Sequence, residues 1–372
     1  MKIALVAPLV STIAQPFIGG AQALLADLAH GLQQRGHAVT LFARAGSSIP
    51  GVPIESIAVP EHVRPATFAE PVNAGSADAG FFTQANLFLE LFLQLQRRAA
   101  EFDLIHAHAF DWPAYTLSTL ARPLPILHTL HLPAVSPEIN EALRVLDRQG
   151  HPLTLITVSQ SCAQTYAPFT PVDHVIYNGL DIRAIPFQPA VAPDAPLLFA
   201  GRVTPEKGVE TALEIAELAN RPLLIAGGIY DQHYYEQRVK PRLARPGARV
   251  NYIGQVAREQ LWQLMGQAAA LLCPIAWDES FGLTPVEAMA TGTPVIAFQR
   301  GAMSEIIQHS QSGFLVPPGA ISQAAALVEH LPAISRAHCR AHVAAHFTLE
   351  TMLDQHEQVY QEVTQGRRGQ GS

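Results

Sequence analysis

Two segments of this 372-residue chain place charged side chains at spacings suited to phosphate and sugar chemistry. In GRVTPEKG, Arg202 and Lys207 follow an apolar run and precede a helical pattern. In ESFGLTPVE, Glu279 and Glu287 flank a Phe-Gly turn that opens another helical pattern. Cations beside helix N-termini favour a diphosphate, and carboxylates accept hydrogen bonds from sugar hydroxyls. We therefore predict a site for a nucleotide-activated sugar.

The helix start in the second segment has two interpretations. Thr284 at the N-cap, Pro285 at the first helical position and Glu287 at the third would form a capping box. Alternatively, Glu287 binds ligand and the backbone amides at the helix start face the sugar and the diphosphate. These amides belong to Phe281, Gly282, Leu283 and Thr284. One carboxylate has several lone pairs, so the two roles are compatible.

Composition limits the classes of function. The chain is 48% apolar and 15% charged, and its formal net charge of −7 argues against a nucleic-acid binder. The length suits two domains. Cys162, Cys273 and Cys339 form no CxxC pair, so we expect reduced thiols in a cytoplasmic protein. The sequence contains no metal-ligand spacing, and we predict no essential metal and no cofactor.

Two apolar stretches could be mistaken for targeting or membrane segments. Residues 1–10 lack a small-residue cleavage site and run into a Gly-Gly turn, so we predict a first strand instead of a signal peptide. No apolar run reaches ~18 residues, which argues against a transmembrane helix. Residues 86–100 form a helix with a broad apolar face, and membrane docking is an alternative there. Its only cations are Arg97 and Arg98, so core packing is the better interpretation.

Short apolar runs alternate with helical patterns along the chain. Near-continuous apolar runs are typical of strands covered on both faces. Strand–helix alternation implies parallel sheets with right-handed crossovers. We predict an α/β protein with two facing Rossmann-like domains, a cleft between them and a seam at 180–195. The predicted strands are 2–8, 38–43, 54–59, 103–108, 125–131, 154–159, 174–179, 196–201, 222–228, 250–254, 270–275, 294–298 and 313–316.

Three further segments have their own predictions. Residues 44–85 are rich in Pro, Gly, Ser and Ala and form loops apart from the short strand at 54–59. Residues 21–35 form a helix that stops at Gly36. The tail at 365–372, QGRRGQGS, is predicted to be disordered.

The polar residues of interest cluster where predicted strands end. Ligands of open parallel sheets bind at the carboxyl ends of the strands. The residues at these ends are Gly19, Gly20, His131, Arg202, Gly254 and Glu279. His106 and His128 precede strand ends and are expected to point into packing, and His108 is a weaker candidate than His131. The absence of GxGxxG and of GxxxxGK[ST] argues against nicotinamide dehydrogenases and P-loop enzymes.

Taken together, these motifs resemble the retaining glycosyltransferases of family 4, which have the two-domain GT-B fold. The resemblance covers nearly the whole length, and its specific motifs are GRVTPEKG and DESFGLTPVEAMATGTPVIA. The departure is RGAMSEII, where the family often has a second Gly after Gly301. The motifs are IGGAQALLADLAHGLQQRGHAVTLF (18–42), VIYNGLDI (175–182), GRVTPEKG (201–208) and DESFGLTPVEAMATGTPVIA (278–297).

The resemblance implies roles for individual residues. Glu279 would contact the donor sugar with the amides at 281–283, and Glu287 the ribose hydroxyls. Arg202 and Lys207 would bind the diphosphate. His131 would lie beside the reacting sugar, Gly20 near the phosphates and acceptor, and Ile253 and Gly254 against the base.

The resemblance also implies a domain arrangement and a reaction. Residues 1–182 would bind the acceptor, 183–347 the nucleotide sugar, and a helix at 348–364 would lead the tail, 348–372, back onto the first domain. The enzyme would transfer a hexose with retention, without a metal, from a UDP-sugar to a hydroxyl acceptor.

Two alternatives remain open at this level. A nucleotide-sugar epimerase on the same scaffold would need cleft carboxylates but no acceptor. A non-catalytic nucleotide-sugar binder would be favoured by the loss of Arg202, Lys207 or Glu279, and all three are present. Membrane association is possible but not indicated, and the oligomeric state is left undecided by the sequence.

Overall fold

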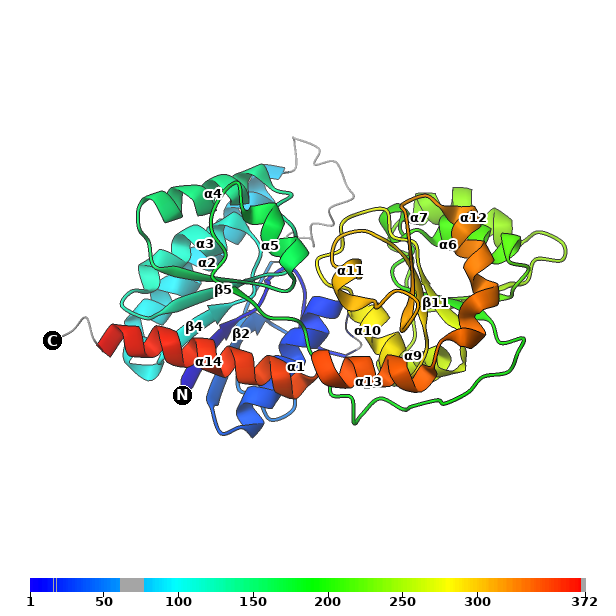
Figure 1. Ribbon diagram of the computed structural model, residues 1–372. Coiled ribbons are helices and arrows are strands. Elements are labelled where there is room, and N and C mark those ends of the chain that lie inside the picture. Colours follow the sequence, from blue (N-terminus) through cyan, green and yellow to red (C-terminus); the bar gives the residue numbers. More distant parts are fainter. Residues whose placement is uncertain (16, 18, 61–76, 369–372) are drawn as a thin grey trace. The chain divides into compact units, whose positions relative to one another are not determined.

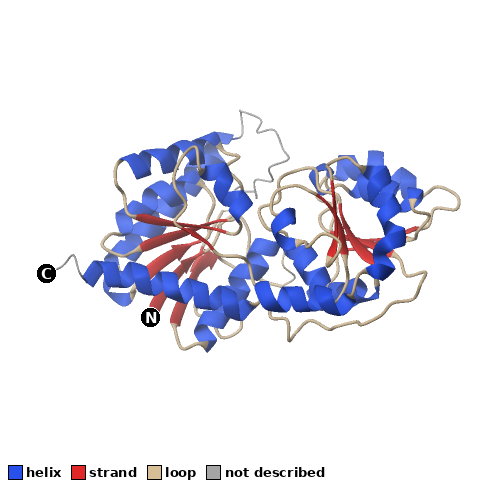
Figure 2. Cartoon of the chain, in the orientation of Figure 1, coloured by secondary structure: helices blue, strands red, loops and turns tan. Residues whose placement is uncertain are grey.

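A computed structural model describes residues 1–15, 17, 19–60 and 77–368. They divide into two compact units, one from Met1–Tyr177 with Met352–Ser372 and the other from Asn178–Thr351. Each unit contains one parallel sheet with helices on both faces, as Figure 2 shows by colour. These two doubly wound sheets confirm the predicted α/β architecture.

The first sheet has the strand order β3-β2-β1-β4-β5-β6-β7, with every pair parallel. Its central strands are buried along nearly their whole length, which explains their continuous apolar runs. The chain grows outward from β1 in one direction and then from β4 in the other, so the topological switch point lies between these two strands. The strands are β1 (Lys2–Val6), β2 (Ala38–Arg44), β3 (Ile54–Ile57), β4 (Leu104–Ala107), β5 (Ile126–Leu130), β6 (Leu153–Thr157) and β7 (His174–Val175).

Helices cover both faces of the first sheet. Figure 1 shows α2, α3 and α4 on one face and α1 and α14 on the other. Gly36, with φ +86°, follows the end of α1 and confirms the predicted stop. The helices are α1 (Gly20–Gln34), α2 (Ala77–Arg97), α3 (Trp112–Ser118), α4 (Pro137–Arg148), α5 (Gln160–Tyr166) and α14 (Leu349–Arg368), with short 3-10 turns at Ala99–Glu101 and Thr119–Ala121.

The region around α2 differs in part from the sequence prediction. The short strand β3 is present, but α2 begins at Ala77, so the loop prediction is wrong for 77–85. The rest of that prediction, 61–76, lies outside the described residues. The apolar face of α2 packs into the core through Phe88, Leu91, Phe92 and Leu95, as predicted. Among the described helices, none is long and apolar enough to cross a bilayer.

The second sheet has the order β10-β9-β8-β11-β12-β13 and is also parallel throughout. Its switch point lies between the neighbouring central strands β8 and β11. This is the position at which open α/β sheets bind ligands. The strands are β8 (Leu197–Ala200), β9 (Leu223–Ala226), β10 (Val250–Gly254), β11 (Ala270–Cys273), β12 (Val295–Phe298) and β13 (Gly313–Val316).

Helices α6 and α12 lie on one face of the second sheet, and α9 and α10 on the other (Figure 1). The α-helices are α6 (Val209–Leu218), α7 (Gln232–Tyr234), α8 (Lys240–Leu243), α9 (Arg258–Gln267), α10 (Leu283–Ala290), α11 (Met303–Ile306), α12 (Ile321–Ala326) and α13 (Arg336–His346). Shorter helices are η3 (Pro205–Lys207), η4 (Tyr235–Val239) and η5 (Leu327–Ala333).

The segment that opens the second unit is irregular, and two arginines of α13 anchor it. Arg340 donates to the carbonyl oxygens of Ile182 and Ile185 at 2.6 and 2.8 Å. The buried Arg336 donates to the carbonyl oxygen of Gln188 at 2.8 Å. These charge-assisted bonds replace the regular ladder that the segment lacks.

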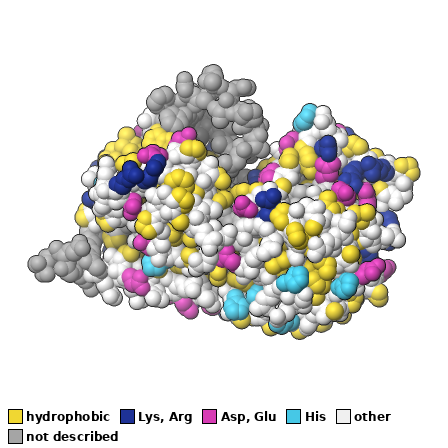
Figure 3. Space-filling view, turned by 45° about the horizontal axis from the view of Figure 1, so that its top comes forward, with side chains coloured by type: hydrophobic (Ala, Val, Ile, Leu, Met, Phe, Trp, Pro, Cys, Tyr) yellow, Lys and Arg dark blue, Asp and Glu magenta, His cyan; other side chains and the backbone are white. Residues whose placement is uncertain are grey.

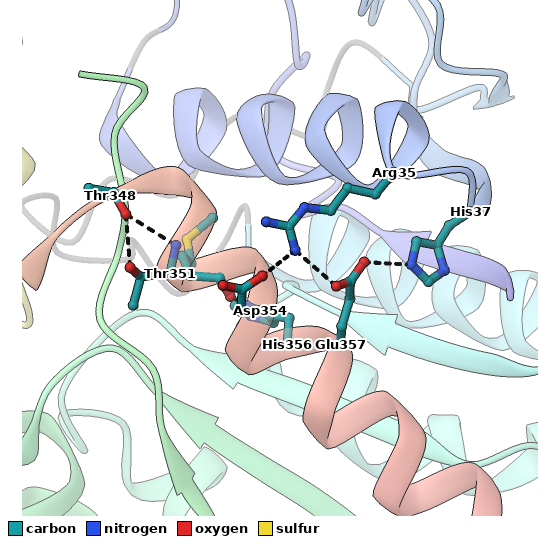
Figure 4. A network of polar contacts seen from close by, with 8 residues as sticks. Arg35, His37, Thr348, Thr351, Asp354, His356 and Glu357 are labelled. Atoms are coloured by element: carbon teal, nitrogen blue, oxygen red, sulfur yellow. Dashed lines mark hydrogen bonds and ion pairs between the residues drawn. The ribbon is translucent and has the colours of Figure 1, made fainter. Parts of the chain in front are cut away.

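Helix α14 returns the chain to the first unit. Thr348 caps it by accepting from the Thr351 amide at 3.1 Å. Further along, Arg35 at the end of α1 donates to Asp354 at 2.6 Å and Glu357 at 2.9 Å, and Glu357 also contacts a ring nitrogen of His37 at 2.8 Å (Figure 4). The helix reaches Arg368, so the prediction of disorder is wrong for 365–368.

Candidate active site

The loops that leave β8 and β11 meet at the switch point of the second sheet. The first contains Arg202 and ends in η3, whose last residue is Lys207, and the second contains Glu279 and leads into α10. The Ala276 amide donates to the Glu206 carbonyl at 2.9 Å and joins the two loops. Gly208, with φ +78°, follows η3, and a Cβ there would collide with the Pro274 carbonyl oxygen. Only glycine allows this close approach.

Lys207 and Glu279 form an ion pair at this edge. Lys207 Nζ lies 2.6 Å from Glu279 Oε2, and both side chains are about one-fifth exposed, at 19% and 18%. The Trp277 indole N–H donates to the same oxygen at 3.2 Å, and Lys207 lies 5.2 Å from the centroid of the Trp277 ring. An ammonium has three donor hydrogens. Lys207 therefore keeps donor capacity for an anion while it holds Glu279.

Arg202 is less firmly held than Lys207. Its guanidinium is 3.5 Å from Glu206 Oε1, at the limit of a hydrogen bond, and 5.7 Å from the centroid of the Tyr230 ring. Its side chain is 38% exposed. A planar guanidinium stacked on an aromatic face and weakly paired is well suited to bind phosphate oxygens.

The backbone of Glu279 is supported by the loop after β12. The Ala302 amide donates to the Glu279 carbonyl at 2.8 Å. Gly301 has φ +53°, and a Cβ on it would collide with that same carbonyl. Ala302, the position of the family's second glycine, is fully buried. The alanine fits because this φ is −74°.

Helix α10 begins at Leu283, and the capping-box interpretation is therefore wrong. Its N-cap is Gly282 with φ +100°, and no side chain caps the helix. Thr284 already lies inside the first turn. A residue with a side chain at 282 would be strained and would place its Cβ 2.6 Å from Met303 Cε. An N-terminus without a side-chain cap has amides that an anion can bind.

The side chains around this helix start separate into core and accessible positions. Phe281 is 2% exposed and packs edge-on against Phe347, with ring centroids 5.8 Å apart, so only its backbone can face a ligand. Gly282, Leu283 and Thr284 are partly exposed.

Glu287 is held by α9. Its Oε1 accepts from Arg258 Nε at 2.9 Å and from the Trp262 indole N–H at 3.2 Å, and Arg258 stacks 5.0 Å from the centroid of the Trp262 ring. Both donors bind Oε1, and no hydrogen bond to Oε2 is present within the described part of the chain. The second carboxylate oxygen therefore has lone pairs for a hydroxyl ligand.

Ile253 and Gly254 end the edge strand β10. Gly254 has φ +74°, its carbonyl accepts from the Gly227 amide at 2.8 Å, and the strand register shifts beside it. Both residues are partly exposed. Across residues 1–15, 17, 19–60 and 77–368, no hydrogen bond joins them to the Lys207–Glu279 pair.

The predicted residues of the first unit lie at the carboxyl edge of its own sheet. Gly20 opens α1, and its N-cap Gly19 supplies no side-chain bond. His131 follows β5, is partly exposed, and its Nε2 is 2.9 Å from His108 Nδ1. His106 and His128 are fully buried, as predicted.

Burial controls the chemistry of the titratable groups near these sites. Burial lowers the pKa of His131 to about 4, so its imidazole is neutral at pH 7. Burial and the charge of Glu279 raise the pKa of the Cys273 thiol to about 12, so it is no nucleophile at neutral pH. Cys162, Cys273 and Cys339 are all free thiols, as expected.

Several site partners were not predicted. They are Trp277, Arg258, Trp262 and Tyr230, and the contact of His108 with His131 was also not predicted. The chain has three tryptophans, and two of them donate to the two candidate carboxylates. A rare indole two positions before Glu279 was a usable signal. The others come from segments distant in sequence, and no spacing rule connects them to the site.

The surface and the metal-ligand residues give two further observations. On the face that Figure 3 shows, Lys and Arg side chains lie next to Asp and Glu and do not gather into one basic patch. Among the residues that the structure describes, no group of three or more His, Cys, Asp or Glu side chains could hold a metal ion.

Two doubly wound parallel sheets with charged loops at a switch point are typical of α/β proteins that bind ligands at the carboxyl ends of their strands. Family models place the chain more closely: "Glycosyltransferase Family 4" matches residues 18–184 and "Glycosyl transferases group 1" matches 181–340. The chain belongs to these family 4, group 1 glycosyltransferases, which have the GT-B fold, and is therefore a nucleotide-sugar glycosyltransferase.

Curated and solved relatives agree with this assignment. The chain is 28% identical to a glycogen synthase of Mycobacterium tuberculosis, over 94% of this chain and 93% of the relative. A sucrose-phosphate synthase of Thermosynechococcus elongatus superposes with a TM-score of 0.77 at 22% identity, covering 98% of this chain and all of the other. Anabaena HepE in complex with UDP-glucose superposes with a TM-score of 0.73 at 22% identity, covering 97% of this chain and all of the other. The two structural likenesses confirm the fold.

Proposed function

We propose that this enzyme transfers a hexose from a UDP-sugar to a hydroxyl acceptor, with retention of anomeric configuration and without a divalent metal. The observation that supports this best is the Lys207–Glu279 ion pair at the β8/β11 switch point, with Trp277 beside it. A cation and a sugar-binding carboxylate are adjacent at the position where open α/β sheets bind ligands.

The proposed diphosphate site consists of Arg202, Lys207 and the uncapped start of α10. Each charge-assisted hydrogen bond to a diphosphate contributes roughly 1.5–3 kcal/mol. The negative charge on the diphosphate grows as the bond to the sugar breaks, so fixed cations stabilise the transition state more than the bound donor. Two side-chain cations thus provide the charge neutralisation for which other enzymes use a metal.

The remaining contacts are assigned from the resemblance and from position. Glu279 would accept from donor-sugar hydroxyls, and Glu287 Oε2 from the ribose. The backbone at Ile253 and Gly254 would lie against the base. His131 and Gly20 would contribute to the sugar and the phosphates from the first unit, which would also bind the acceptor.

The proposed step uses no protein nucleophile. The acceptor oxygen forms a bond to the anomeric carbon on the face that the diphosphate leaves. The carbon–oxygen bond to the diphosphate breaks through an oxocarbenium-like state, and the acceptor proton passes to a leaving phosphate oxygen. The enzyme binds, orients and neutralises charge.

A thermal-shift panel of UDP-, GDP-, ADP- and dTDP-sugars tests the donor. UDP-glucose is the first choice, since the Anabaena protein of the same fold was crystallised with it. A donor at 100 times its Kd stabilises the protein by about 2.7 kcal/mol. Equal shifts for all four bases would argue against a base-specific site.

The three free cysteines and the donor class are consistent with a cytoplasmic enzyme.

Product analysis tests the reaction itself. NMR of the glycoside formed with the preferred donor should show the donor's anomeric configuration, and inversion would refute the mechanism. The rate should persist in excess EDTA. Incubation without acceptor should leave the sugar nucleotide intact or hydrolysed, whereas a new sugar nucleotide would indicate epimerisation.

A further inference from the structure

Buried histidines line the carboxyl edge of the first sheet. The ring centroid of His106, within β4, lies 4.2 Å from that of His108 and 5.4 Å from that of His356 in α14. Its Nδ1 lies 2.7 Å from the Tyr360 hydroxyl and its Nε2 2.7 Å from Thr129 Oγ1. The row ends at His131, whose ring stacks on that of His108 with an interplanar angle of 24°. His106 and His108 thus form a buried, desolvated layer of rings against which His131 stacks.

The imidazole rings of His108 and His131 are both neutral at pH 7. His108 is 2% exposed, and burial, followed by neighbouring histidines, holds its pKa well below the usual value. Burial likewise lowers the pKa of His131 to about 4. A neutral imidazole has one N–H and one lone pair. The 2.9 Å contact between His108 Nδ1 and His131 Nε2 therefore contains one proton, which belongs to one ring or to the other.

The environment of His108 decides which ring holds that proton. His108 Nε2 is buried and has no hydrogen-bond partner within the described part of the chain. If His131 donated through Nε2, His108 would carry its own proton on Nε2, as a buried N–H without an acceptor. Orphaned buried N–H groups are rarer in proteins than unsatisfied acceptors. The favoured arrangement has His108 Nδ1–H donating to His131 Nε2.

The consequence for His131 follows from counting protons. Its Nε2 lone pair is occupied, so its single N–H is on Nδ1, which makes no hydrogen bond to the described residues. In this tautomer the ring has no free lone pair. It can donate a hydrogen bond to an oxygen, but it cannot accept a proton from the acceptor hydroxyl.

We propose that His108 is a positioning residue that locks His131 in the Nδ1–H tautomer, so that His131 donates a hydrogen bond to a hydroxyl of the transferred sugar and takes no part as a base. The proposal rests on the proposed function for the identity of the ligand. Its tautomer component rests on the contact between the two rings and on their burial, and does not depend on the identity of the ligand.

The first test is the tautomer of His131 in the unliganded wild-type protein, measured by ¹⁵N–¹H NMR of the imidazole nitrogens. The His131 signals are identified from their absence in His131→Gln. We expect a protonated Nδ1 and an unprotonated Nε2 at pH 7. A proton on Nε2 would overturn the proposal whether or not any donor sugar is turned over, so this result is independent of the proposed function.

The second test is kinetic and uses isosteric variants. His108→Leu removes the donor and should lower kcat/KM about fivefold, because a neutral hydrogen bond contributes about 1 kcal/mol and the His131 tautomer is released. His108→Asn places an amide donor near the Nδ1 position and should recover most of that loss. Equal kcat/KM for wild type and His108→Leu would refute the positioning role.

The matched control is His128→Leu, which removes a fully buried histidine of the adjacent strand that contacts Ser118 Oγ at 3.1 Å instead. It should lower the unfolding free energy as His108→Leu does but keep kcat/KM. If it lowers kcat/KM equally, the effect of His108 is general core damage and the proposal fails.

Discussion

Lys207→Ala tests the central feature of the proposed site. Two unit charges 2.6 Å apart attract by about 6 kcal/mol at an effective dielectric constant near 20. Desolvation of the two side chains, each about one-fifth exposed, offsets most of this. We expect the unfolding free energy to fall by about 1–3 kcal/mol, the usual range for a hydrogen bond to a charged group.

The loss in catalysis should be larger than this stability change suggests. Removing one fixed stabiliser of transition-state charge lowers rates by about 10²–10³-fold, or roughly 2.7–4 kcal/mol. Initial rates of UDP release give kcat/KM, and thermal shifts with UDP and with uridine separate phosphate from base binding. Lys207→Ala should weaken the response to UDP and leave that to uridine unchanged.

The chain offers a matched control in Lys240. Its Nζ is also 2.6 Å from a glutamate oxygen, that of Glu236, but the Lys240 side chain is 57% exposed on α8. Lys240→Ala should therefore change neither kcat/KM nor the UDP response measurably. If folded Lys207→Ala lost less than about threefold in kcat/KM, Lys207 would not belong to the site.

Three further perturbations follow from the geometry. Arg258→Leu should raise the donor KM several-fold more than it lowers kcat, because Arg258 orients Glu287, and a loss confined to kcat would contradict that role. Gly208→Ala should unfold at lower urea than Gly247→Ala, which has the same φ of +78° but no atom within 4 Å, and equal midpoints would exclude the predicted clash. Burial lowers the pKa of His356 to about 4, so its contribution to stability is complete above the unfolded value near 6.5 and is lost as the pH falls towards 4. His356→Phe should flatten that pH dependence by up to about 1.4 kcal/mol per pH unit, whereas parallel stability curves would argue against a neutral buried His356.

Much of the fold could be predicted because buried parallel strands have a distinctive composition. Each predicted apolar run overlaps a strand of the structure, although the run at 174–179 contributes only the two residues of β7. The boundaries of helices were less predictable. The first turns of α2 fall in a stretch with many Ala and Gly residues, which have no strong apolar period. Tertiary packing along its Phe and Leu face determines that this helix forms.

The Lys207–Glu279 contact was within reach of sequence reasoning because parallel-sheet topology brings strand ends together. No local sequence rule could predict the partners of Glu287. Its capping box depended on a helix starting at Pro285, but Gly282 can adopt a left-handed conformation and the helix starts two residues earlier. That shift places Glu287 two residues deeper in the helix, beyond the capping position, and α9 supplies Arg258 and Trp262 as its partners.

The same reasoning explains why His108 was undervalued beside His131. Alternation along a strand predicts that His106 and His108 share one face, but it does not predict what that face meets. The partner of His108 is 23 residues away and that of His106 is Tyr360, 254 residues away. A buried imidazole is satisfied only when such distant groups converge. The protonation state of a residue at the site can therefore be inferred from the structure but not from any spacing in the sequence.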